Sequence, residues 1–260
     1  VWIDGEVRFI TAIAGDTLTL NSALTKGAPV AGEAVKRGQT YKPASEGHPP
    51  LSVTVFQDAQ SPGSGPVARG IGARVSSLAL TDFTVGQIPK LTLGLELLDH
   101  DEVIATAPAS PVFGTQNPPV VIHGIAQRDG VQFDIGALEL TLENTISREV
   151  DINQEGGTRR LFVGGRSVTW TVDPFLSQAD VALQDAWRDN ESFELFVALG
   201  IKDAAGDIVQ GSAVGIYIPN AIFTENARED ADGVLKHTLS FQAHESDLTG
   251  GDDEVFLGFV

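Results

Sequence analysis

The sequence contains no cysteine and no methionine, and it has few aromatic and few basic residues. The absence of cysteine excludes disulfides and thiolate metal ligands. Two tyrosines and three tryptophans leave little material for an aromatic sugar-binding platform. Lysine and arginine number 17 against 35 aspartate and glutamate residues, and this net charge of −18 disfavours a surface that binds phosphates.

Long apolar segments are also absent. No run approaches the roughly 20 residues that span a bilayer as a helix, and no basic, apolar signal peptide is visible at the N-terminus. We therefore expect no membrane partner. Residues 1–10 read as the middle of a strand and no initiator methionine is present, so we also expect a missing segment upstream of Val1.

What the sequence does contain is alternation of apolar and polar residues, punctuated by Gly, Pro, Asn and Asp. This period of two is typical of half-buried strands. The fold class that it predicts is mainly β. The alternating segments are residues 7–13, 17–20, 51–56, 75–81, 90–97, 137–142, 167–172, 193–197, 216–223 and 235–243.

One segment has a different period. Over residues 177–190 the apolar residues fall three or four apart, and Ser177 with Asp180 resembles a capping box. This pattern predicts one helix that ends near Asn190. Its apolar stripe is expected to bury Leu183 and Trp187 against a sheet.

A Pro-rich stretch divides the chain. Residues 106–119 favour an extended connector, because proline cannot continue a central strand. We expect a first β lobe over residues 1–105 and a second over residues 120–260. The strand order in residues 51–97 matches that in residues 193–242, which suggests two related lobes, although two unrelated β-meanders would look similar.

Catalytic signatures are not found. The sequence has no Gly-x-Ser-x-Gly motif and no phosphate-binding loop. His100 lies among carboxylates in residues 98–102, a segment that is more simply a solvated acidic turn at a strand end. We expect no cofactor, no metal and no enzymatic activity, although an acid/base pair for glycoside hydrolysis is defined by spatial separation and not by sequence.

The most distinctive stretch combines a strand ending in Glu143-Asn144, a polar loop over residues 145–158, and a strand through Gly165-Arg166-Ser167 that leads to the helix. This arrangement resembles the tail tube (major tail) proteins of long-tailed bacteriophages of the siphophage type. The resemblance covers most of residues 50–245 and is sharpest over residues 138–175.

The resemblance implies a β-sandwich subunit whose sheet joins those of its neighbours in a barrel around a lumen, with rings stacked into a tube. It implies a place in the virion tail, assembly in the host cytoplasm, and tail terminator, distal tail and tape-measure proteins as partners. DNA would pass through the acidic lumen during genome ejection without specific binding. Three duplicated chains or six single-domain chains would complete a ring.

The loop over residues 145–158 is the candidate contact site, since it is longer than a tight hairpin needs. It either contacts an adjacent ring or subunit, or it is a mobile hairpin tip. The residues expected to make the contact are Arg148, Glu149, Val150, Asp151, Ile152 and Glu155.

Two other classes of protein stay open at this point. One is a tail-tip or extracellular β-sandwich that binds carbohydrate or a receptor, which a cluster of exposed aromatics would favour. The other is a β-fold hydrolase, which would need an acidic pair in a cleft.

Overall fold

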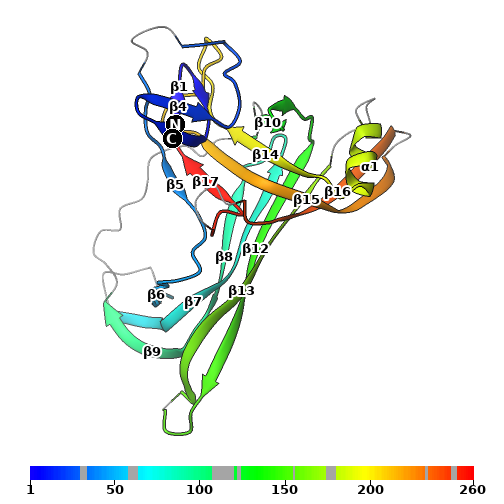
Figure 1. Cartoon of the computed structure of the whole chain (residues 1–260). Helices are drawn as coiled ribbons and strands as arrows, with labels where there is room; N and C mark the ends of the chain where they lie inside the picture. Colours follow the sequence, from blue (N-terminus) through cyan, green and yellow to red (C-terminus); the bar gives the residue numbers. More distant parts are fainter. Residues whose placement is uncertain are drawn as a thin grey trace.

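A computed structural model of the chain describes residues 1–29, 34–57, 64–106, 120–121, 124–154, 156–173, 180–231, 234–246 and 251–260 (Figure 1). These residues form antiparallel β-structure with one short helix, which confirms the predicted mainly β class. Within the described residues, no helix is long and apolar enough to cross a membrane.

Most strands belong to one large antiparallel sheet of 13 strands. Its main path is β11-β10-β14-β15-β16-β13-β12-β7-β6; β8 and β9 also pair with β7, β17 with β15, and β5 with β17. The strands are β5 (Gln39–Tyr41), β6 (Leu51–Phe56), β7 (Ser64–Thr84), β8 (Lys90–Glu96), β9 (Asp99–Thr106), β10 (Ile125–Arg128), β11 (Val131–Gln132), β12 (Ala137–Val150), β13 (Thr158–Val172), β14 (Ser192–Leu199), β15 (Val214–Ala231), β16 (Val234–Ala243) and β17 (Phe256–Phe259).

Strand β7 changes partners along its length. Its first part pairs with β6 and β9, and its second part pairs with β8 and β12. The change falls where Gly72 has a φ of +64° and where a Cβ on Gly70 would lie 2.6 Å from the Leu97 side chain. Glycine fits both positions because it tolerates positive φ and has no Cβ.

The main core lies between the β7–β12–β13 part of the sheet and the β14–β15–β16 part. Trp170 of β13 and Phe241 of β16 are directly opposite each other on paired strands and contribute an edge-to-face contact to this core, with ring centroids 5.9 Å apart. Burial of these side chains is the largest favourable contribution to folding. The fully buried members include Leu138, Leu140, Val168, Trp170, Leu195, Val197, Leu199, Ile216, Ile218, Leu239 and Phe241.

A second, smaller core lies on the other face of β14, beneath the N-terminal segment. This segment forms the hairpins β1 (Trp2–Ile3) with β2 (Glu6–Val7) and β3 (Ile10–Ala14) with β4 (Thr17–Leu20). Phe9 stacks on Tyr217 at 5.3 Å and contacts Phe196 edge to face at 6.0 Å. Because both faces of β14 are covered, its residues 195–199 are apolar without alternation.

The helix α1 (Asp180–Arg188) confirms the predicted helix, although it ends before Asn190 and residues 177–179 lie outside the described part. Asn190 has a φ of +55° and the Glu191 amide donates to the Ala186 carbonyl at 2.9 Å, a helix-ending arrangement with Asn in the left-handed position. The expectation for Trp187 is wrong. Its side chain is 45% exposed, whereas Ala186 is buried, so Ala186 lies on the face of the helix that packs on the sheet. The Leu183 side chain lies outside the described part.

The predicted connector lies almost entirely outside the described residues, since β9 ends at Thr106 and residues 107–119 are not described. The strands on its two sides share one sheet, because β7 pairs with β12. The first lobe is therefore not a separate sheet. Its relationship to the second lobe by duplication stays a prediction.

Candidate assembly surface

Strands β12 and β13 form a long antiparallel hairpin that extends away from the rest of the molecule (Figure 1). Up to Glu143, β12 is flanked by β7 as well as by β13. Beyond Asn144 the described strands leave β12 paired with β13 alone, so a two-stranded ribbon projects from the sheet. We call residues 145–163 the ribbon, and residues 150–157 its tip.

The ribbon corrects the predicted extent of the loop. Residues 145–150 continue β12, and only residues 151–157 connect the two strands. Ile146 pairs with Val163, and Arg148 pairs with Leu161. None of the side chains of residues 145–150 is buried, although Leu161 on the opposite strand is. Polar residues are therefore frequent in residues 145–150, and their frequency made a strand resemble a loop.

The ribbon begins after Asn144, and contacts of this residue fix its base. Asn144 is the second residue of the Glu143-Asn144 pair at which the sequence predicted that a strand ends. A register shift follows it in β12, and its side-chain amide donates to the Val75 carbonyl of β7 at 3.0 Å. Arg148 then forms an ion pair with Glu96 at 3.0 Å, and Glu149 is bound by Arg160 and Arg159. These side chains are partly exposed, so each pair contributes at most about 1 kcal/mol to stability.

The tip carries two apolar side chains in water. Val150 is 77% exposed and Ile152 is 99% exposed. The turn around them is held by its own hydrogen bonds: the Asp151 amide donates to the Gly157 carbonyl at 3.0 Å, and the Asp151 carboxylate accepts from the Asn153 amide at 2.9 Å. A turn held in one conformation presents both apolar side chains at low entropic cost.

Of the six residues expected to make contacts, Arg148, Glu149 and Val150 thus lie at the end of β12, and Asp151 and Ile152 lie in the turn. Glu155 lies outside the described residues. The structure separates these residues by role. Arg148 and Glu149 form ion pairs with other residues of the same chain, whereas Val150 and Ile152 project into solvent.

A second apolar feature is the strand β8, which the sequence predicted over residues 90–97 without indicating that it lies at a sheet edge. Leu91 is opposite Leu80 of β7, and Leu93 is opposite Leu78. Leu80 belongs to the main core, yet Leu91 and Leu93 are about half exposed. Among the described strands, β8 pairs only with β7, so its outer edge is open for hydrogen bonding.

Arg166 of the Gly-Arg-Ser segment binds residues near the C-terminus. Its guanidinium donates to Glu254 at 2.7 Å and to Asp252 at 2.9 Å, and its side chain is only 9% exposed. Hydrogen bonds from Ser45 and from this guanidinium lower the pKa of Asp252 to about 2. Arg166 therefore connects β13 to the segment that leads into β17.

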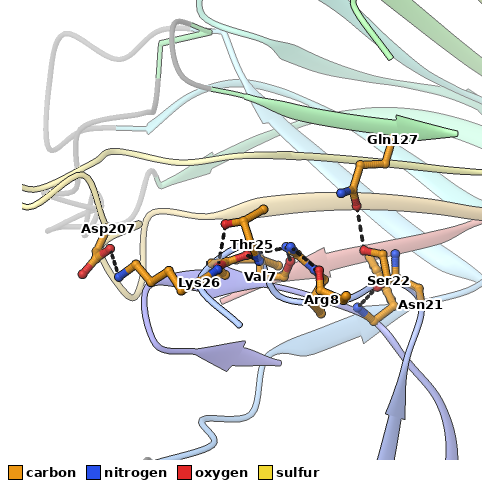
Figure 2. Close-up of polar contacts among 11 residues, drawn as sticks. Val7, Arg8, Asn21, Ser22, Thr25, Lys26, Gln127 and Asp207 are labelled. Carbon is orange, nitrogen blue, oxygen red and sulfur yellow. Dashed lines mark hydrogen bonds and ion pairs between the residues drawn. The ribbon is translucent and has the colours of Figure 1, made fainter. Parts of the chain in front are cut away.

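A buried polar cluster fixes the N-terminal segment on the body (Figure 2). Arg8 and Glu6 form an ion pair at 2.6 Å, and Arg8 also donates to the Ala23 carbonyl. Burial raises the pKa of Glu6, but hydrogen bonds from Thr25 and Lys26 and the charge of Arg8 lower it overall.

The same segment is tied to two other parts of the chain. The Ser22 hydroxyl donates to the Gln127 side-chain oxygen of β10 at 2.6 Å, and Lys26 pairs with Asp207 (Figure 2). These contacts keep residues 1–26 over β14. The alternation in Glu6-Val7-Arg8-Phe9 indicates that Glu6 and Arg8 share one face and that Val7 and Phe9 share the other. Nothing in the sequence indicates that Glu6 and Arg8 are buried.

No group of three or more His, Asp or Glu side chains is placed to hold a metal ion in the part of the chain that the structure describes. The described chain is thus a β-rich protein with an open sheet edge at β8 and exposed apolar side chains at the ribbon tip.

A comparison with protein families agrees with this class. The family described as "Phage tail tube protein" matches residues 6–243, and the chain belongs to this family. Membership implies a structural protein that self-assembles into a tube, a component of the virion tail and not an enzyme. A comparison with curated proteins found no match.

Proposed function

We propose that this chain is the tube subunit of a siphophage-type tail, which forms closed rings that stack into a tube and conduct DNA during ejection. The observation that carries the proposal is the projecting ribbon with its exposed Val150 and Ile152. Another surface that covers this apolar tip would remove it from water, and this burial would stabilise the contact.

Lateral contact within a ring would use the sheet edge. A neighbouring copy that adds a strand to β8 would satisfy its open hydrogen-bonding groups and cover Leu91 and Leu93. Repetition of this contact around a rotation axis closes a continuous barrel.

Contact between rings would use the ribbon. A tip on one end of the subunit that binds a different surface of the next copy is a heterologous contact, and such contacts propagate without closing. Stacked rings follow from this geometry.

Passage of DNA is the part of the proposal that rests on charge. The net charge of −18 favours a lumen from which the phosphate backbone is repelled, so that DNA slides without binding. By resemblance to the family, tail terminator, distal tail and tape-measure proteins would contact the tube, and assembly would occur in the host cytoplasm.

Ring symmetry follows from whether the chain is duplicated. If residues 51–97 and 193–242 are related domains, three chains complete a ring with pseudo-sixfold symmetry. If the chain contributes a single tube domain, six chains are needed.

Negative-stain electron microscopy of the purified full-length protein tests the proposal. We expect stacked rings with an open channel, and class averages viewed along the tube give the symmetry. Strictly monomeric particles at high protein concentration would contradict the tube and would favour a tail-tip binding module.

A further inference from the structure

A groove beside the N-terminal hairpins has a volume of about 770 Å³. We call it the N-terminal groove; its walls include Phe9, Ile10, Ile13, Leu18, Val35 and Arg37. We propose that the ribbon tip of one copy inserts into the N-terminal groove of a copy in the next ring. This inference rests on the proposed stacking and names the surface that receives the tip.

The positions of the two surfaces suit a contact between rings. The ribbon points away from the body at one end of the molecule, whereas β4, the N-terminus and the C-terminus lie at the opposite end (Figure 1). A copy placed beyond the ribbon in the same orientation would present its groove end to the tip. One contact of this kind per copy is sufficient to build a stack.

The chemistry of the groove suits an apolar occupant. Ile13 is 68% exposed and Val35 is about half exposed at the wall, while Phe9 and Tyr217 are buried deeper. Val150 and Ile152 are the two most exposed large apolar side chains in the described chain. Contact between the two surfaces would remove both sets of apolar side chains from water.

Charge distinguishes this groove from the other cavities. Asp151 lies between the two apolar residues of the tip, and the exposed Arg37 lines the N-terminal groove. A smaller cavity of about 320 Å³ carries Asp134 on its wall. Another of about 200 Å³ carries Glu245, Glu254 and Arg166, and this arginine is already paired with Glu254 and Asp252. An acidic wall repels a tip carboxylate, whereas an arginine attracts it.

Because the chain has no cysteine, disulfide cross-linking tests the contact directly. The double variant Ile13→Cys/Ile152→Cys in the full chain should form tubes, and mild oxidation should convert the monomer band on a non-reducing gel into a ladder of multimers. Each single variant should give no ladder.

A matched control uses Val131→Cys/Ile152→Cys. Val131 is exposed to a similar degree as Ile13 but lies on β11, outside the groove. Intact tubes without the Ile13–Ile152 ladder, or an equal ladder from the Val131 control, would overturn the inference while the proposed function stands. If the wild-type chain forms no tubes at all, the proposed function fails and this contact fails with it.

A second variant tests the charge without a disulfide. Arg37→Glu should raise the protein concentration needed for tube formation roughly tenfold, and Arg37→Lys should largely restore it. Light scattering against concentration measures the threshold. An unchanged threshold for Arg37→Glu would contradict a tip carboxylate at this wall.

Discussion

The two ends of the β12–β13 hairpin differ sharply although they belong to the same pair of strands. At the base, Leu138, Leu140, Val168 and Trp170 are almost fully buried, whereas Ile152 at the tip is 99% exposed. The base has β7 on one side and β16 on the other, while the described ribbon past Asn144 has neither. The flanking strands therefore decide which part of the hairpin serves folding and which part is available for assembly.

The largest expected effect on stability lies at the base. Trp170→Ala removes a ring that packs on Phe241 in the main core, and we expect a loss of about 3–5 kcal/mol in the free energy of unfolding. Chemical denaturation of the unassembled protein measures it. Ile152→Ala is the matched change at the tip and should alter this free energy by less than about 0.5 kcal/mol. Comparable losses in the two variants would remove the distinction between base and tip.

The next effect is expected at the boundary, where Arg166 pairs with Asn144 across the hairpin. Arg166→Ala would leave the Glu254 and Asp252 carboxylates without their cation, at a cost of about 2–3 kcal/mol. Hydrogen exchange should show lost protection in β17 and unchanged protection in the ribbon. Arg166→Lys should recover part of the loss, and uniform deprotection would show that Arg166 does not act locally.

A smaller effect is expected from pH. The folded-state pKa values of Asp252 (about 2) and Glu6 are lowered below their usual ranges, so each group binds its proton more readily in the unfolded chain. Their contribution is present above the unfolded-state pKa and is lost as pH falls towards the folded-state pKa. Melting temperature should therefore fall between about pH 5 and pH 2. Asp252→Asn should be less stable at neutral pH and should show a shallower fall, and an identical slope would contradict the assignment.

The smallest effect is expected at the ribbon's ion pairs. Glu149→Gln breaks the contacts with Arg160 and Arg159, which are more than half exposed, and should cost less than about 1 kcal/mol. Chemical denaturation measures this value too. A loss as large as that of Trp170→Ala would mean that the ribbon, and not only the base, contributes strongly to folding.

The local parts of the fold could be predicted from the sequence. Alternation marked most strands, including residues 137–142 of the base, and the three-to-four spacing marked the helix. Family resemblance identified the hairpin region as distinctive and was confirmed by the family match over residues 6–243. Local periodicity is enough for these features because each one is set by neighbours in the chain.

Long-range features could not be predicted. The partner exchange of β7 at Gly72 depends on which strands lie beside it. Residues 145–150 appeared as a loop because none of their own side chains is buried. The open edge of β8 was hidden because Leu91 and Leu93 have the same alternation as buried strand residues. Alternation in the sequence predicts which side chains share one face of a strand, but it does not predict which other element covers that face.

The most direct test of the account is a cryo-electron microscopy reconstruction of assembled tubes. We predict that the tip, residues 150–157, lies against a subunit of the adjacent ring with Val150 and Ile152 covered, while the base keeps the packing of Trp170 on Phe241 described above. A tip that projects into solvent or into the lumen, with Ile152 still exposed, would contradict its role in assembly.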